Sequence, residues 1–239
     1  MDSEERQPEE NQEQQKQPEK KVAGRTWSNV KSVASTLLFV WLFTHHIAQA
    51  TVVPTESMSP TILVGDHFFL DKVAFPANFP GVLQKYLPVR TIQRGKILAF
   101  WSPEVQGLRL VKRVIGLPGD VIEIRNRVVY INGRRLEEPY VVHSDKRRIA
   151  QRDDMAPMTI PADSFFMMGD NRDNSNDSRF WGVAHREEII GTPLFVYWSY
   201  DGGPYQPNMT MGEWANHYAS VATHFFTNTR WFRTGTIVR

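Results

Sequence analysis

The feature that most constrains this chain is a long uncharged stretch near its N-terminus. No Asp, Glu, Lys or Arg occurs between Lys31 and Glu56, and residues 33–47 are mostly apolar. A membrane-spanning helix needs about 20 mostly apolar residues, so the stretch is just long enough. Basic residues precede it, and the first charges after it are acidic. This predicts a single-pass anchor over residues 26–50 with the N-terminus in the cytoplasm.

Two other interpretations of this stretch stay open. His45, His46 and Gln49 make its second half polar, which also suits a helix buried in a soluble protein. The segment 48–50 reads Ala-Gln-Ala, the A-x-A form of a signal-peptide cleavage site, so the stretch could be a removable leader. The preceding residues 1–25 form a hydrophilic tail that is long for a leader. We therefore favour a disordered cytoplasmic tail followed by an uncleaved anchor.

The remaining residues, 51–239, are typical of one domain built from short strands, and they are numerous enough to bury a core. Asn132–Gly133 between two apolar runs is the strongest short-range hairpin signal, and Pro118–Gly119 suits the centre of a type II turn. Such turns separate the runs and no internal repeat is visible, which predicts mainly β structure in antiparallel sheets. The predicted strands are residues 67–73, 96–101, 108–115, 121–124, 128–131 and 192–200.

The C-terminal segment differs from the rest of the domain. Apolar residues recur at helical spacing over residues 211–227, which predicts a helix. Packing of this helix on the domain is the simpler interpretation, and a position on a membrane surface is the alternative.

Composition excludes several function classes. The chain has no cysteine, which removes disulfides, thiol nucleophiles and thiolate metal sites. Its net charge of +2, without a basic stripe, argues against nucleic-acid binding. No H-E-x-x-H motif occurs. Asp173, Ser175 and Asp177 have the spacing that opens a calcium loop, but Ser178 and Ala184 stand where that loop needs Gly and Glu. We expect neither a metal nor another cofactor.

The remaining catalytic candidates are a serine and a lysine. No G-x-S-x-G elbow occurs, and Ser57 lies between prolines, where a hydroxyl usually only shapes a turn. The alternation of a strand would put Lys112 on the same face as Leu110 and Val114. Burial there would lower the lysine pKa from its ordinary value of about 10.4, as a general base requires. Most strand lysines instead extend to solvent, so the pattern alone decides neither way.

Four motifs in order give these residues a context. Residues 55–61 read T-E-S-M-S-P-T, and Gly65–Asp66 precedes a lysine at position 72. Residues 94–100 are followed by K-R-V-I-G-L-P-G-D at 112–120, and residues 169–182 read G-D-N-R-D-N-S-N-D-S-R-F-W-G. By these motifs the chain resembles the bacterial type I signal peptidases, which are membrane-bound leader peptidases with a serine–lysine dyad.

The resemblance implies a role for each matching residue. Ser57 would be the nucleophile and Lys112 the general base of an acyl-enzyme mechanism. The Ser57 N–H and the Thr55 hydroxyl would form the oxyanion hole. Ser175 would hydrogen-bond the lysine amine and orient it. The remaining implied residues are an ion pair that holds the loop, Asp177 and Arg179, and the lining of shallow pockets for small residues, Val53, Pro54, Met58, Leu110 and Val111.

The resemblance also implies a fold, partners and a location. The family has two antiparallel sheets with a small β-rich cap, which residues 121–162 would form here. The partners would be signal-peptide-bearing preproteins and the lipid bilayer. The catalytic domain would then lie on the extracytoplasmic face of the plasma (inner) membrane.

Two residues depart from the family pattern. Glu56 stands where some members have glycine, and we expect its side chain to point to solvent, because a carboxylate beside Lys112 would raise that pKa and oppose the mechanism. Lys96 replaces an acidic residue, which we expect to alter only surface electrostatics.

Other functions stay open at this point. A mitochondrial inner-membrane type of peptidase would have the same dyad and a narrower set of precursors. A catalytically silent, membrane-anchored β-domain that binds leader segments is the alternative from another class. The self-cleaving repressors share serine–lysine chemistry, but the predicted anchor and the lack of a DNA-binding domain argue against them.

Overall fold

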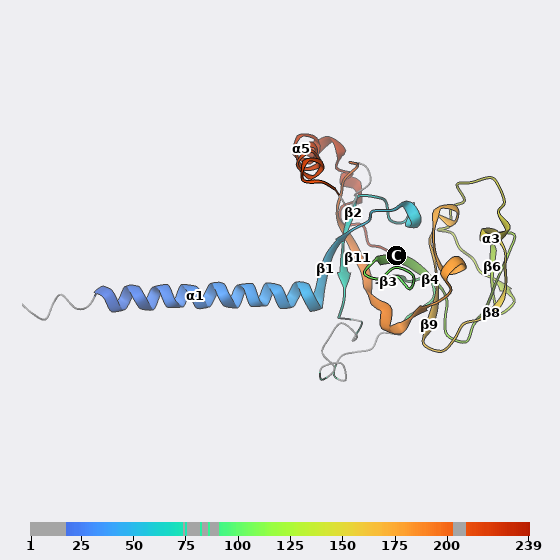
Figure 1. The fold of residues 1–239 in the computed structure, drawn as a ribbon, viewed down its shortest axis with the longest axis horizontal. Coiled ribbons are helices and arrows are strands. Elements are labelled where there is room, and N and C mark those ends of the chain that lie inside the picture. Colours follow the sequence, from blue (N-terminus) through green and yellow to red (C-terminus); the bar gives the residue numbers. More distant parts are fainter. Residues whose placement is uncertain (1–17, 74, 76–81, 83–85, 87–90, 203–208) are drawn as a thin grey trace, which may run out of the picture. The chain divides into compact units, whose positions relative to one another are not determined.

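The computed structural model describes residues 18–73, 75, 82, 86, 91–202 and 209–239, and these divide into two units at Thr44/His45 (Figure 1). The predicted disordered tail covers residues 1–25. Its first 17 residues lie outside the described residues.

The first unit is the helix α1 (Pro18–Leu42), which continues into a π-helical turn, η1 (Phe43–Ile47). The helix begins before the predicted anchor, so residues 18–25 are helical. Proline suits the first turn of a helix, and Glu, Lys and Ala are good helix formers. Leu37, Leu38 and Phe39 are exposed. No helix in the described part of the chain combines the length and the apolar content that a membrane crossing requires.

The end of the predicted anchor is a strand. Residues 48–50 belong to β1 (Ala48–Val52), which pairs antiparallel with β2 (Asp66–Asp71) and sets Ala50 opposite Phe69. The backbone groups of this segment therefore have partners in a sheet. The same pairing holds the Ala-Gln-Ala segment within a strand, where the sequence raised the alternative of a cleavage site.

The main sheet has seven strands in the order β1-β2-β11-β3-β4-β9-β10, and every pair is antiparallel. The strands not yet given are β3 (Ile97–Trp101), β4 (Arg109–Gly116), β9 (Ser164–Met168), β10 (Ala184–His185) and β11 (Ile189–Ser199). The long β11 lies between β2 and β3, so it joins the two halves of the sheet. The predicted mainly β, antiparallel architecture is confirmed.

A second sheet forms the segment predicted as a cap. Its order is β7-β6-β5-β8, from β5 (Val121–Arg125), β6 (Val128–Ile131), β7 (Arg134–Arg135) and β8 (Met155–Thr159), with the short helix α3 (Ala150–Asp153) before β8. Asn132 and Gly133 have φ of +51° and +76°, which suits the tight turn that the sequence predicts. Asn126 and Arg127 also have positive φ, at +50° and +69°, in the turn between β5 and β6.

Apolar side chains fasten the cap to the main sheet. One buried cluster takes Ile115 from β4 and Phe166 and Met168 from β9, and packs them against isoleucines and a valine of the cap. Gly116 lies at this junction, and a Cβ there would come within 2.1 Å of Ile160 Cδ1. Only glycine permits this approach without a shift of the neighbouring side chain.

The C-terminal segment forms the predicted helix, α5 (Met211–Asn228), followed by the short turn η6 (Trp231–Arg233). Thr210 and Glu213 cap its N-terminus reciprocally. The Phe225 ring lies 6.0 Å from that of Trp198 on β11, so the helix packs on the domain. The turn η6 is attached to β2, because Arg233 Nη2 lies 2.5 Å from Oδ2 of the fully buried Asp66.

Candidate active site

Ser57 lies in a single 3-10 turn, η2 (Glu56–Met58), between β1 and β2. Met58 and Ile62 beneath it are 1% and 0% exposed and belong to the core of the main sheet. The Ile62 N–H donates to the Met58 carbonyl at 2.9 Å, which continues the turn. These two buried side chains therefore fix the position of the turn that contains Ser57.

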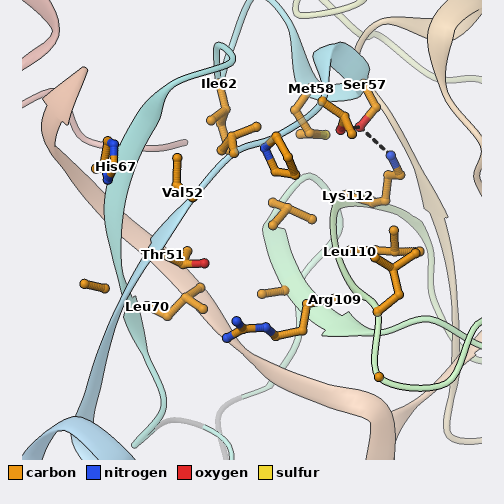
Figure 2. A pocket seen from close by; sticks show the side chains of 18 of the residues that line it. Thr51, Val52, Ser57, Met58, Ile62, His67, Leu70, Arg109, Leu110 and Lys112 are labelled. Carbon is orange, nitrogen blue, oxygen red and sulfur yellow. Dashed lines mark hydrogen bonds between the residues drawn. The ribbon is translucent and has the colours of Figure 1, made fainter. Parts of the chain in front are cut away.

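Lys112 lies opposite Leu98 of β3 and is 3% exposed. Its Nζ donates a hydrogen bond to Ser57 Oγ at 2.5 Å (Figure 2). Desolvation lowers the pKa of Lys112 from 10.5 to about 8. The Asp177 and Asp170 charges oppose this shift, and the Arg179 charge reinforces it. An amine with this pKa loses its proton near pH 8, more than two pH units below an ordinary lysine, and it can then accept a hydrogen bond from the serine hydroxyl.

The neighbouring Arg113 makes a different set of contacts. Its Nε and Nη2 lie 2.8 and 2.6 Å from the two carboxylate oxygens of Asp170, and both side chains are almost fully buried. Thr61 donates to the same carboxylate at 2.5 Å. This cluster ties β4 to the loop after β9 and to the segment after Ser57. The sequence placed Arg113 on the face opposite Lys112 but did not identify its partner.

The loop 169–179 lies directly against Ser57. The Asn171 N–H donates to the Ser57 carbonyl at 3.1 Å. A Cβ on Gly169 would come within 2.4 Å of the Ser57 carbonyl oxygen and 2.3 Å of Ser175 Oγ. The loop can approach Ser57 this closely only because residue 169 is glycine.

Ser175 lies in this contact region but does not make the predicted bond. Its hydroxyl is buried and makes no hydrogen bond of ordinary geometry within the described ranges, but it interacts with the Asp177 carboxylate, whose pKa it helps to lower. The lysine amine is directed to Ser57 instead. The predicted hydrogen bond between Ser175 and Lys112 is therefore not formed in this structure.

Asp177 and Arg179 form the ion pair that the sequence implies. Arg179 Nε and Nη2 each lie 2.8 Å from an Asp177 oxygen, and the Gly169 N–H donates to the same carboxylate at 3.0 Å. Burial raises the pKa of Asp177, but the Arg179 pair and the Gly169 N–H outweigh it, so the pKa lies below its ordinary value. The carboxylate stays ionised and fixes the loop.

A cavity of about 510 Å³ opens on one side of the dyad (Figure 2). The predicted pocket residues line it: Val53, Pro54, Met58, Leu110 and Val111. Thr55 is also in the lining, with its hydroxyl 3.3 Å from Ser57 Oγ. Sequence reasoning missed His67, Arg109 and Tyr197, which line the cavity as well. No sequence signal linked these three residues to the cavity: His67 and Tyr197 come from other strands, β2 and β11, and Arg109 lies at the start of β4 outside the motif that begins at Lys112.

Comparison with known proteins gives this arrangement a family. The model described as "Signal peptidase, peptidase S26" matches residues 26–198. The signal peptidase I of Leptolyngbya laminosa is 32% identical over 176 residues, which cover 71% of this chain and 78% of the relative. The chain belongs to the signal peptidase family, peptidase S26.

Other members give similar figures. The signal peptidase I of Pseudomonas aeruginosa is 31% identical, with 71% of this chain and 72% of the relative covered. The signal peptidase I P of Bacillus subtilis subsp. natto is 32% identical, with 72% and 89% covered. A solved signal peptidase I from Enterococcus faecalis is 36% identical and covers 43% of this chain and 97% of its own, with a TM-score of 0.36. Membership in the signal peptidase family identifies the chain as a peptidase.

One strand edge near the dyad is free to pair with another chain. Residues 109–112 of β4 pair with β3 on one side, but the pairing with β9 begins only at Arg113. Among the described strands, none covers the other side of residues 109–112, and these residues line the cavity. The backbone groups of an edge of this kind can pair with an extended segment that is added as a further strand.

The two departures from the family pattern lie on the surface. Glu56 is exposed, and its carboxylate accepts a hydrogen bond from Asn174 Nδ2 at 3.2 Å, as expected of a side chain directed to solvent. Its charge is not among those that shift the Lys112 pKa. Lys96 is also exposed. No three-membered His, Cys, Asp or Glu cluster suited to a metal ion occurs among the residues that the structure describes.

Proposed function

We propose that this protein is a serine endopeptidase that removes N-terminal signal peptides from exported preproteins. Ser57 is the nucleophile and Lys112 the general base. The observation that carries this proposal is the contact of 2.5 Å between Lys112 Nζ and Ser57 Oγ, with the amine buried and its pKa lowered to about 8. Family membership supports the same reaction.

The reaction proceeds in two halves. In the first, neutral Lys112 takes the proton of the Ser57 hydroxyl while Oγ attacks the scissile carbonyl. The Ser57 N–H and the Thr55 hydroxyl stabilise the oxyanion that forms. The tetrahedral intermediate breaks its C–N bond, and the lysine returns the proton to the departing amine. The signal peptide is then held as an ester on Ser57.

In the second half, Lys112 takes a proton from water, and the hydroxide attacks the ester. The intermediate collapses with Ser57 as the leaving group, and the lysine returns the proton to Oγ. The amine must turn from Ser57 toward water for this step. The buried hydroxyl of Ser175, in the loop that contacts Ser57, is the group that we propose accepts a hydrogen bond from the amine and orients it at that stage.

The cavity supports the substrate class. Its lining near the dyad is mostly apolar, with Val53, Met58 and Val111 among the residues. A peptide added to the free edge at residues 109–112 would be extended, with alternate side chains directed into the cavity. We propose that this cavity takes the small side chains of an A-x-A signal sequence.

We also propose that residues from the N-terminal unit attach the enzyme to the bilayer, with the N-terminus in the cytoplasm and the peptidase domain on the other face. The exposed side chains of Leu37, Leu38 and Phe39, together with the basic residues before them, support this arrangement. Alkaline extraction of isolated membranes is the test. Release of the protein into the soluble fraction would contradict an integral anchor.

Cleavage of a signal-bearing preprotein by the detergent-solubilised chain tests the peptidase activity. We expect Ser57→Ala and Lys112→Ala each to reduce kcat/KM by about 10³ or more, because each removes a member of the dyad. Lys96→Ala is the matched control, since this exposed lysine lies on the surface. Circular dichroism checks that each variant is folded.

Two results would contradict the proposal in different ways. Retained cleavage by Lys112→Ala would place the general base elsewhere. Failure of the unmodified chain to cut any of several preproteins would favour a silent protein that only binds leader segments.

A further inference from the structure

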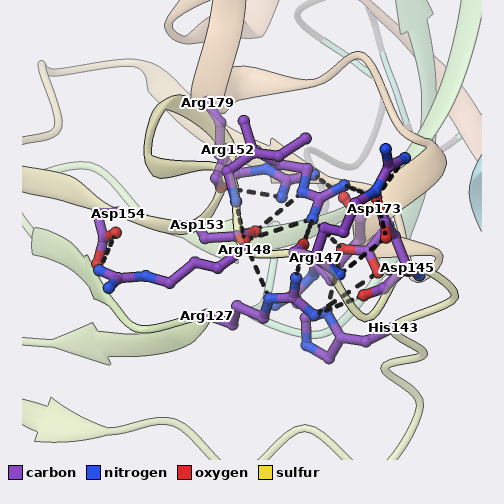
Figure 3. A network of polar contacts seen from close by, with 12 residues as sticks. Arg127, His143, Asp145, Arg147, Arg148, Arg152, Asp153, Asp154, Asp173 and Arg179 are labelled. Carbon is purple, nitrogen blue, oxygen red and sulfur yellow. Dashed lines mark hydrogen bonds and ion pairs between the residues drawn. The ribbon is translucent and has the colours of Figure 1, made fainter.

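A dense cluster of charged side chains lies where the cap meets the catalytic loop (Figure 3). We call it the cap cluster. Its members from the cap are Arg127, His143, Asp145, Arg147, Arg148, Arg152, Asp153 and Asp154, and its member from the catalytic loop is Asp173. The mechanism above uses none of these side chains.

Asp173 is the point at which the loop enters this cluster. It belongs to the 3-10 turn η4 (Arg172–Asn174), and its side chain is 2% exposed. Arg152 Nη2 lies 3.3 Å from Oδ1, and Arg127 Nη1 lies 3.9 Å from Oδ2. The Asp145 N–H donates to Oδ2 at 2.7 Å, and His143 Nδ1 lies 3.4 Å from Oδ1. Every contact named here comes from the cap.

The two arginines that hold Asp173 are themselves fixed. Asp153 is 1% exposed, with Arg152 Nε at 2.9 Å and Arg127 Nε at 3.0 Å from its carboxylate oxygens. Burial raises the pKa of Asp153, but these hydrogen bonds outweigh it and lower the pKa to about 2. The carboxylate therefore stays charged, and it holds both guanidinium groups in the geometry that receives Asp173.

The cap also holds the other end of the catalytic loop. Arg179, the partner of Asp177, donates from Nη1 to the Arg152 carbonyl at 3.3 Å and from Nη2 to the Arg172 carbonyl at 2.7 Å. Ser175 and Asp177 lie between these two attachment points. Since the same loop touches the Ser57 carbonyl through Asn171, a displacement of the loop reaches the dyad directly.

We propose that Asp173 is a positioning residue, which the cap holds through Arg152 and Arg127 so that the loop 169–179 stays in register with Ser57 and Lys112. The inference rests on the proposed peptidase activity and extends it to the role of the cap. Displacement of a catalytic group by about 1 Å can cost about 10²-fold in rate, so a loop that is mostly irregular needs such an attachment.

Two aspartates of the cluster allow a matched comparison in the full-length protein. Asp173→Asn removes the charge that the cap arginines hold and keeps the size of the side chain. Asp154→Asn is the control. Asp154 also accepts a backbone N–H, from Asn126 at 2.9 Å, and pairs with Arg148 at 2.5 Å, but these contacts stay within the cap. Cleavage of a preprotein gives kcat and KM, and chemical denaturation gives stability.

We expect Asp173→Asn to lower kcat about tenfold with little change in KM, because substrate binds on the cavity side and the displaced groups surround the lysine. Asp154→Asn should stay within about twofold of the unmodified enzyme. Asp173→Glu should restore part of the loss, since it returns the charge.

The pH profile separates positioning from simple stability. The low pKa of Lys112 comes mainly from desolvation, and the charges that act on it are Asp177, Arg179 and Asp170. A loosened loop admits water to the amine, so the rise of kcat/KM should move to higher pH in Asp173→Asn and stay unchanged in Asp154→Asn. If Asp173→Asn fails to fold, Arg127→Gln is used instead, since Arg127 is 19% exposed and makes the longer contact.

The proposal is overturned if Asp173→Asn and Asp154→Asn behave alike, or if activity falls only in proportion to stability with an unchanged pH profile. An inactive unmodified enzyme would instead refute the proposed function, and that result is seen before any variant is compared.

Discussion

The main sheet and the cap each bury a cation, and they treat it in opposite ways. Lys112 and Arg152 are 3% and 7% exposed. Around Lys112, burial dominates, the nearest partner is a hydroxyl, and the pKa falls to about 8. Around Arg152, the hydrogen bond that its guanidinium donates to Asp153 and the charge of Asp173 outweigh burial and raise the pKa above its ordinary value.

The difference shows that burial alone does not determine the state of a cation. A buried amine that no carboxylate contacts loses its proton more readily and can act as a base. A buried guanidinium surrounded by carboxylates stays charged and holds these groups in place. The main sheet contains both solutions on consecutive residues, since Arg113 follows Lys112 and pairs with Asp170. Three substitutions test this contrast, from the largest expected effect to the smallest.

Removal of a counter-charge should have the largest effect. Asp170→Ala leaves the buried guanidinium of Arg113 without its carboxylate, and we expect the free energy of unfolding to fall by about 3–5 kcal/mol. Denaturant titration of the purified protein measures this quantity. A loss below about 1 kcal/mol would mean that the Gly95 carbonyl, which accepts from Arg113 at 2.7 Å, is a sufficient partner.

Removal of the Lys112 amine should change the stability by an amount that depends on pH. The unfolded chain keeps Lys112 charged to about pH 10.4, but the folded protein releases the proton near pH 8. The unfolded state therefore binds more protons between these pH values, and stability increases as pH rises through this window. We expect the unmodified protein to gain about 3 kcal/mol relative to Lys112→Met from pH 8 to 10.5. Unfolding curves at several pH values measure the difference in the free energy of unfolding between the two proteins. A difference that does not change with pH would contradict a lowered pKa of Lys112 in the folded protein.

An exposed pair should show almost no effect. Arg125 and Glu123 lie 3.2 Å apart on β5 of the cap, with side chains 55% and 26% exposed. We expect Glu123→Gln to change stability by less than about 0.5 kcal/mol, because solvent screens the pair. The same titration provides the measurement. A change of 2 kcal/mol or more would contradict the expectation that an exposed ion pair contributes little to stability.

The parts of the fold that sequence could predict are those with local causes. The Asn132–Gly133 turn and the apolar spacing of residues 211–227 depend on neighbours along the chain, and both elements form where expected. The strand β1 could not be predicted in this way, because residues 48–52 continue the uncharged stretch without a break. Only their partner, β2, makes them a strand.

The site shows the same division. The motifs and the alternation along β4 put Lys112 on a face with apolar residues, and the structure puts Ser57 beside it. The partner of Arg113 lies 57 positions further along the chain, and no periodicity relates Asp173 to the cap arginines. Ser175 could not be settled from a motif either, since its neighbours depend on how the loop 169–179 folds against Ser57.

The contact between Asn171 and the Ser57 carbonyl has a consequence for biosynthesis. A ribosome synthesises the turn that contains Ser57 long before it reaches the loop 169–179, which holds this turn in place. It completes Arg233, which clamps Asp66 just after that turn, later still. A nascent chain therefore already carries Ser57 and Lys112 while the loop 169–179 that contacts Ser57 is still to be made. The order of the chain delays the appearance of a protease until the whole domain has been made.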